Sequence, residues 1–171
     1  MIKKYIFVLF ISLLITGCGI APENIKPVSG FEIDRYLGKW YEIARLDHSF
    51  ERGLTKVTAE YSLRDDGGVK VINRGFDAAT NEWDEAEGKA YFVDAPDIGQ
   101  LKVSFFGPFY GGYNIIELDK EDYQYSLVAG PDYSYLWILA RSPDLDQAII
   151  DKLVSQAKTL GFPTEELIFL Y

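Results

Sequence analysis

Polar and apolar side chains alternate along much of the middle of the chain. The pattern is clearest in Thr55–Arg64, where Val57, Ala59 and Tyr61 fall on one side and polar residues fall on the other. A period of two is typical of a half-buried β-strand. The tetrapeptide that follows, Asp65-Asp66-Gly67-Gly68, accepts the positive φ angles of a tight hairpin turn. This part of the sequence therefore predicts a strand that turns back into a second strand.

Other segments between turn residues also have the character of strands. The expected strands are Trp40–Leu46, Thr55–Arg64, Val69–Asp77, Trp83–Val93, Gln100–Phe106, Phe109–Leu118, Tyr123–Ala129 and Tyr135–Arg141. Consecutive strands joined by short turns are antiparallel, and an up-and-down barrel closes such a sheet without leaving edges. We therefore predict an all-β fold, an eight-stranded antiparallel up-and-down barrel. An interior of this size can be filled by side chains or can hold one small ligand.

The hydrophobic period lengthens to three or four residues near the end of the chain, which predicts a helix. Ser142 as cap and Pro143 in the first turn favour a helix start, and Gly161 favours its end. The apolar stripe consists of Leu145, Ile149, Leu153, Ala157 and Leu160. We expect this stripe to pack the helix against the outside of the barrel rather than to bind a partner, with Leu167–Tyr171 as a short final strand.

The N-terminus predicts export. Lys3 and Lys4 precede the apolar run Tyr5–Ile15, which is shorter than the roughly 20 residues that a membrane-spanning helix needs. Residues 1–17 are therefore interpreted as a signal peptide. The run ends in Ile15-Thr16-Gly17-Cys18, which resembles the lipobox of bacterial lipoproteins. The resemblance implies cleavage before Cys18 and a lipid attached to that cysteine.

The residues after the cysteine predict where the protein is held. Residues 18–30 would form the lipidated cysteine and a flexible tether rich in proline and glycine, and residues 31–171 a single folded domain. In enteric lipoproteins an Asp after the cysteine tends to retain the protein in the inner membrane. Because Gly19 stands there, we expect a lipid anchor in the outer membrane, on its periplasmic face.

Composition excludes several classes of function. The chain carries 26 acidic and 17 basic residues, a formal net charge of −9, which repels nucleic-acid phosphates. Cys18 is the only cysteine, so a disulfide, a thiolate metal site and a cysteine nucleophile are not expected. His48 is the only histidine, which rules out a three-histidine zinc site, and no serine-centred nucleophile motif accompanies it. We therefore expect no enzyme activity, no metal and no cofactor.

Two distant motifs carry a family resemblance. Gly38-Lys39-Trp40, within Asp34–Arg45 at the start of the first strand, resembles the first signature of the lipocalin family. Arg141, at the end of the eighth strand, stands where lipocalins have an arginine that packs over this tryptophan. The middle signature is met only loosely, by Glu121-Asp122-Tyr123. Gly38, Trp40 and Arg141 are thus expected to determine the fold rather than to bind a ligand.

The resemblance extends to the bacterial outer-membrane lipocalins that are related to apolipoprotein D. It covers roughly residues 28–170 and includes Glu51-Arg52-Gly53-Leu54, the stretch 62–68 and the stretch 103–113. It implies a barrel with one open mouth that binds fatty acids or lysophospholipids for storage, transport or repair in the envelope. Because the chain is acidic, an anionic head group would have to be held by a local base such as Arg52, or by burial of its acyl chain.

Strand alternation nominates the residues that face the ligand. In the eighth strand both faces are apolar, and we assign Tyr135 and Trp137 to the interior. Phe106, Phe109, Tyr110 and Tyr113 cluster near one end of the barrel, where they either line the mouth or cap the core. The candidate ligand-binding residues are Val57, Tyr61, Val103, Phe105, Tyr110, Tyr113, Tyr135 and Trp137.

Two other functions remain open from the sequence. An aromatic mouth on an acidic barrel could bind a partner protein or a second copy of the chain, which would form a homodimer. Some lipocalins are enzymes, and His48 would be the residue to consider, although we interpret it as a loop or mouth residue.

Overall fold

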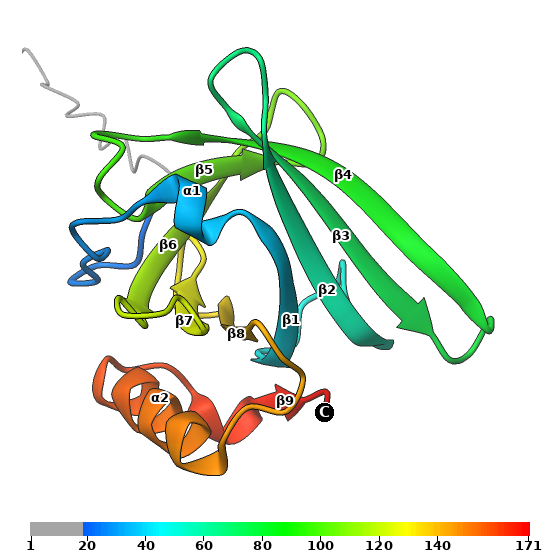
Figure 1. Ribbon diagram of the computed structural model, residues 1–171. Coiled ribbons are helices and arrows are strands. Elements are labelled where there is room, and N and C mark those ends of the chain that lie inside the picture. The colour runs from blue at the N-terminus through cyan, green and yellow to red at the C-terminus, as the bar shows by residue number, and fades with distance from the viewer. Residues whose placement is uncertain (1–18) are drawn as a thin grey trace, which may run out of the picture.

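The computed structural model describes residues 19–171 (Figure 1), so the predicted signal peptide and Cys18 lie outside the described residues. The elements are α1 (Ile33–Tyr36), β1 (Gly38–Arg45), β2 (Leu54–Leu63), β3 (Val69–Asp77), β4 (Glu82–Phe92), β5 (Gln100–Ser104), β6 (Gly111–Leu118), β7 (Tyr125–Ala129), β8 (Leu136–Ala140), α2 (Gln147–Thr159), the 3-10 turn η1 (Thr164–Glu166) and β9 (Ile168–Phe169). Among the described residues, no helix is both long enough and apolar enough to cross a bilayer.

The strands form one antiparallel sheet that closes on itself. Strands β2 to β8 pair in chain order, and β8 pairs with β1. The sheet closes because Gly38–Tyr41 of β1 also pairs with Thr58–Tyr61 of β2. The predicted eight-stranded barrel is therefore confirmed. The bounds of β3 agree with the prediction residue for residue.

The observed strand bounds differ from the predicted ones on both sides of the connection between β5 and β6. We expected β5 to reach Phe106 and β6 to begin at Phe109, whereas β5 ends at Ser104 and β6 begins at Gly111. Pro108 cannot donate a ladder hydrogen bond, and the Phe109 amide instead donates to the Phe106 carbonyl (3.1 Å) in a turn. The connection is therefore a longer loop than the sequence predicted.

Helix α2 packs on the outside of the barrel, as expected. Its buried side chains are Ile150, Leu153 and Ala157. They share a core cluster with Leu136 and Ile138 of β8. Figure 1 shows the helix lying beside the lower part of the barrel wall.

The predicted start of this helix is wrong. The helix begins at Gln147, and the Asp146 carboxylate accepts a hydrogen bond from the Ala148 amide at 2.7 Å. Ser142 instead accepts from the Asp144 amide in a preceding turn (3.2 Å). Asp146 is a good N-cap because its side chain satisfies an amide that has no partner within the helix.

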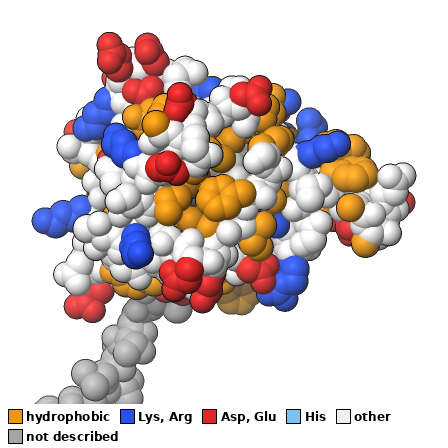
Figure 2. Space-filling view, turned by 90° about the horizontal axis from the view of Figure 1, so that it is seen from below, with side chains coloured by type: hydrophobic (Ala, Val, Ile, Leu, Met, Phe, Trp, Pro, Cys, Tyr) orange, Lys and Arg blue, Asp and Glu red, His pale blue; other side chains and the backbone are white. Residues whose placement is uncertain are grey.

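The final strand is shorter than predicted and lies outside the barrel. Ile168 and Phe169 of β9 pair with Arg45 and Ala44 of β1. Their side chains are largely exposed. Figure 2 views the molecule from the side of α2 and β9, and hydrophobic side chains gather there among acidic groups.

The segment that precedes the domain is docked on the barrel. The Val28 amide donates to the Ile115 carbonyl, and the Gly99 amide donates to the Val28 carbonyl, both at 2.8 Å. Ile25 is buried in a core cluster. The prediction of a flexible tether over residues 19–30 is therefore wrong for its later part, because its apolar side chains reach the core despite the proline and glycine content.

One end of the barrel is closed by Trp40 and Arg141. The Trp40 side chain is fully buried, and the Arg141 guanidinium carbon lies 4.0 Å from the centroid of its ring. Arg141 also donates to the Lys39 carbonyl (2.9 Å) and to the Arg35 carbonyl (2.7 Å). Gly38 has a φ of +87°, which other residues rarely adopt. These contacts join α1, β1 and the end of β8.

Candidate functional site

The inner wall of the barrel is apolar on the strands that alternation assigned to it. Tyr61 belongs to the core cluster around Trp40, and Val103 and Phe105 pack against that cluster. Val57 is buried on the same face of β2 as Tyr61. Four of the predicted ligand-binding residues thus share the interior of the barrel.

Strand β8 separates its two apolar faces as the sequence suggested. Leu136, Ile138 and Ala140 lie in the cluster with α2. Leu139 belongs to the inner cluster, and Trp137 packs against it. Tyr135 lies next to Trp137 with ring centroids 6.1 Å apart. The helix therefore covers one face of β8, and Trp137 faces the interior.

Two aromatic residues after β5, Tyr110 and Tyr113, lie on opposite faces of the barrel wall. Tyr113 packs against the inner cluster. Tyr110 lies on the outer surface, where its ring is 6.4 Å from Tyr91 and the Lys102 ammonium is 5.5 Å above it. The assignment of Tyr110 to the ligand site is therefore corrected, because the loop before Gly111 carries this side chain to the outside of the sheet.

Three tyrosines form a hydrogen-bonded floor deep in the barrel. The Tyr113 hydroxyl shares hydrogen bonds with those of Tyr36 (2.8 Å) and Tyr61 (2.9 Å), and the Tyr36 hydroxyl lies 3.1 Å from the Ser126 hydroxyl. Burial raises the pKa of Tyr36 to about 12 and raises those of Tyr61 and Tyr113 well above their ordinary value. All three phenols are therefore neutral at physiological pH and can donate hydrogen bonds.

A buried charged cluster occupies the barrel near the loop between β1 and β2. Arg45 donates to the Glu42 carboxylate at 2.8 Å and to the Glu51 carbonyl at 2.7 Å. The Glu51 carboxylate accepts a hydrogen bond from the Trp137 indole at 3.2 Å. Glu42, Arg45 and Glu51 are all nearly inaccessible to water. Sequence reasoning missed this cluster, because a glutamate and an arginine within a strand ordinarily indicate an exposed face.

His48 belongs to the same region and is buried. Its Nε2 atom lies 3.1 Å from the Glu51 carboxylate. Its ring stacks on Phe50 at 4.0 Å and lies 5.2 Å from Trp137. The loop position predicted for His48 is correct, and its surroundings are aromatic and acidic. Among the described residues, no group of three or more His, Cys, Asp and Glu side chains is arranged to hold a metal ion.

Comparison with known protein families agrees with this architecture. The model of the lipocalin-like domain matches residues 31–170. The chain is a lipocalin. The family that the Gly38-Lys39-Trp40 motif indicated is thus confirmed, and so is the relation to apolipoprotein D.

This lipocalin has close bacterial relatives. It is 56% identical to the outer membrane lipoprotein Blc of Vibrio cholerae, over 98% of each chain. It is 51% identical to the protein of that name from Escherichia coli K12, over 93% of this chain and 90% of the relative. Insecticyanin from the tobacco hornworm has the same fold, with a TM-score of 0.69 and 23% identity over 90% of this chain and 86% of the other.

These relatives also indicate the cellular location of the lipocalin. It is a lipid-anchored protein of the outer membrane, as the sequence predicted. Lipocalins bind small hydrophobic ligands, and the lipocalin described here is a binding protein.

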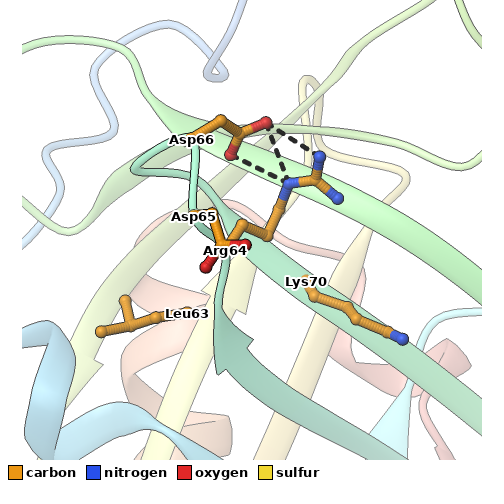
Figure 3. Close-up of a pocket in the computed structure, with 5 residues that line it drawn as sticks. All are labelled: Leu63, Arg64, Asp65, Asp66 and Lys70. Carbon is orange, nitrogen blue, oxygen red and sulfur yellow. Dashed lines mark hydrogen bonds and ion pairs between the residues drawn. The ribbon is translucent and has the colours of Figure 1, made fainter.

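The described structure of this lipocalin also contains a charged hollow on its surface (Figure 3). It measures about 330 Å³ and is lined by Leu63, Arg64, Asp65, Asp66 and Lys70. Arg64 is paired with Asp66 at 2.8 Å, and this hydrogen bonding holds the pKa of the Asp66 carboxyl well below its ordinary range. The hollow lies at the turn between β2 and β3, so it is separate from the interior lined by Val57 and Trp137.

Glu42 should make the stability of this lipocalin depend on pH. Burial, together with the nearby Glu51 carboxylate, raises the pKa of Glu42 well above its ordinary 4.5, against the opposing effect of Arg45. Above the ordinary pKa the folded protein keeps a proton that the unfolded chain has released, so stability falls as pH rises toward the raised value. Glu42→Gln should remove this decline, and urea unfolding across the pH range measures it.

Comparing Glu42→Gln with the unchanged protein needs a control in which an exposed carboxylate is lost instead of a buried one. Glu85 lies exposed on β4, where it is paired with Arg74, and Glu85→Gln removes a surface charge of the same kind. If the free energy of unfolding depended on pH in the same way for Glu42→Gln and for the unchanged protein, Glu42 would not be the source of the decline.

Proposed function

We propose that this lipocalin binds one single-chain lipid, a fatty acid or a lysophospholipid, inside its barrel without catalysing a reaction. Attached through Cys18 at the periplasmic face of the outer membrane, it would store, transport or help to repair envelope lipids. Family membership and the outer-membrane relatives support this proposal.

The observation that carries the proposal is an apolar inner wall with buried polar groups beside it near the β1–β2 loop. Val57, Phe105 and Trp137 supply an apolar surface, and burial of an acyl chain on such a surface contributes about 25 cal/mol per Å². Glu42, Arg45 and Glu51 supply polar groups near the β1–β2 loop. An apolar chain with one polar end fits a wall of this kind.

The pairing of the arginines favours one lipid class. Arg45 is already bonded to Glu42, and the exposed Arg52 donates twice to the Asp47 carboxylate, at 2.7 and 2.9 Å. Arg52 therefore offers little to a free fatty-acid carboxylate, contrary to the role considered for it from the sequence. A zwitterionic lysophospholipid brings its own countercharge, and we infer that it binds more tightly than a fatty acid.

Native mass spectrometry with lipid extraction tests the proposal. The protein would be offered fatty acids and lysophospholipids, and we expect one lipid per barrel. Trp137→Ala removes a large apolar contact, and at about 2 kcal/mol this should weaken binding by about tenfold or more.

Tyr110→Ala is the matched control, since Tyr110 is an aromatic residue on the outer surface. It should leave binding unchanged, and far-ultraviolet circular dichroism verifies that both variants fold. A folded barrel that accepts no single-chain lipid would refute the proposal. Equal losses for Trp137→Ala and Tyr110→Ala would place the ligand elsewhere.

A further inference from the structure

The loop between β5 and β6 exposes two large apolar side chains. Phe106 is 78% exposed and Phe109 is 79% exposed. In Figure 1 this light green loop projects away from the barrel wall. Gly107 of this loop and Arg64 of the β2–β3 turn line a common pocket, so the loop lies beside that turn. Apolar groups exposed to this degree on a soluble surface mark a site of interaction.

The N-terminal segment leaves the barrel beside this loop. The Asn114 side-chain amide donates to the Ile20 carbonyl at 2.8 Å, which holds Ile20 on the outer face of β6. A Cβ atom on Gly112 would overlap the same carbonyl, so the absence of a side chain there permits the contact. Gly112 stands two residues after Tyr110. The path from the barrel to Cys18 therefore starts next to the aromatic loop.

The distance from this point to the anchor is short. Cys18 precedes Ile20 by two residues, and two extended residues span at most about 7 Å. A lipid on Cys18 therefore brings the bilayer surface close to β6.

Basic residues border the loop on an otherwise acidic protein. Lys102 of β5 lies over the Tyr110 ring, and Lys89 of β4 pairs in register with Ser104. Lysines next to exposed aromatic residues suit a surface of lipid phosphates and acyl chains, where aromatic side chains favour the interface and cations are attracted to anionic lipids. The chemistry of the loop thus matches the membrane that its neighbouring segment approaches.

We propose that Phe106 and Phe109 enter the surface of the membrane that holds the anchor. The contact would hold the β5–β6 loop and the adjoining wall of the barrel against the bilayer. This inference rests on lipid attachment at Cys18, but it does not depend on which lipid the barrel binds.

The test uses the full lipidated chain in vesicles of phosphatidylethanolamine and phosphatidylglycerol. Because Cys18 is the only cysteine and would carry the lipid, Phe109→Cys supplies a single free thiol for an environment-sensitive fluorophore. Its emission should shift to the blue and should be largely lost when the vesicles contain a lipid-borne quencher.

Trp83→Cys is the matched control. Trp83 is 59% exposed and lies near the start of β4, where it pairs with Phe76. The β5–β6 loop instead follows Ser104, which pairs with Lys89 near the other end of β4. Its fluorophore should show neither change, and flotation with the vesicles verifies that both proteins are anchored. Adding Phe106→Ser to the chain labelled at position 109 should reduce the quenching there.

Two results would overturn the proposal. One is equal quenching at positions 109 and 83. The other is a blue shift at position 109 that grows with protein density and is insensitive to the lipid-borne quencher. This second result would mean that the loop contacts another copy of the chain.

Discussion

Replacing Trp40 with alanine should lower the free energy of unfolding by about 3–5 kcal/mol. The side chain is fully buried and its indole nitrogen donates to the Tyr36 carbonyl at 2.8 Å. Its ring also lies beneath the Arg141 guanidinium. The substitution would leave a cavity at the closed end and would remove both contacts. Urea unfolding followed by circular dichroism measures the loss.

Trp83→Ala provides the comparison. Trp83 is 59% exposed and its main aromatic neighbour is Phe76, at 5.4 Å. Surface truncations of this kind cost little, and we expect a loss below about 1 kcal/mol. If both alanine variants lost the same stability, Trp40 would not have the structural role that its burial implies.

Replacing Arg45 with alanine should cost about 3–5 kcal/mol, because it removes one partner of a buried ion pair. Glu42 would lose its countercharge. The carbonyls of Glu51 and Leu54 would lose the donor that now lies 2.7 and 3.1 Å from them. The loss should be smaller at low pH, where Glu42 is protonated, and equilibrium unfolding at two pH values measures both effects.

Arg52→Ala and a double variant test this reasoning. Arg52 is exposed and paired with Asp47, and surface pairs of this type contribute about 1 kcal/mol or less. Combining Arg45→Ala with Glu42→Gln removes the unpaired buried charge, so the double variant should be more stable than Arg45→Ala alone. A double variant that is no more stable would show that the lost carbonyl contacts account for the whole cost.

Local patterns predicted most of the fold. The alternation of Val57, Ala59 and Tyr61 identified both β2 and its inner face, because a strand with one buried face must alternate. The end-to-end contact between Trp40 and Arg141 was indicated by family resemblance rather than by any local pattern. The helix start was predicted too early because Ser142 and Asp146 both have side chains that can cap a helix, and only the contacts of the folded chain show that Asp146 is the cap.

The interior of the site was harder to predict. Glu42 and Arg45 lie in β1, whose neighbouring residues Tyr41 and Ile43 pack toward α2, so this strand is buried on both sides and its alternation carries no information about exposure. Tyr110 and Tyr113 are three residues apart across a loop of irregular conformation. The sequence did not determine that the first faces outward and the second inward.

The closure of the barrel has a consequence for how the chain folds. Arg141 contacts the carbonyls of Lys39 and Arg35, which are 102 and 106 positions away in sequence. Contacts between such distant residues form slowly, since a long loop must close before they stabilise the chain. Strand β1 also cannot complete its pairing until β8 and β9, the last strands to be synthesised, are available. We therefore expect the barrel to stay unclosed until synthesis is complete. This suits a polypeptide that is exported across a membrane before it folds.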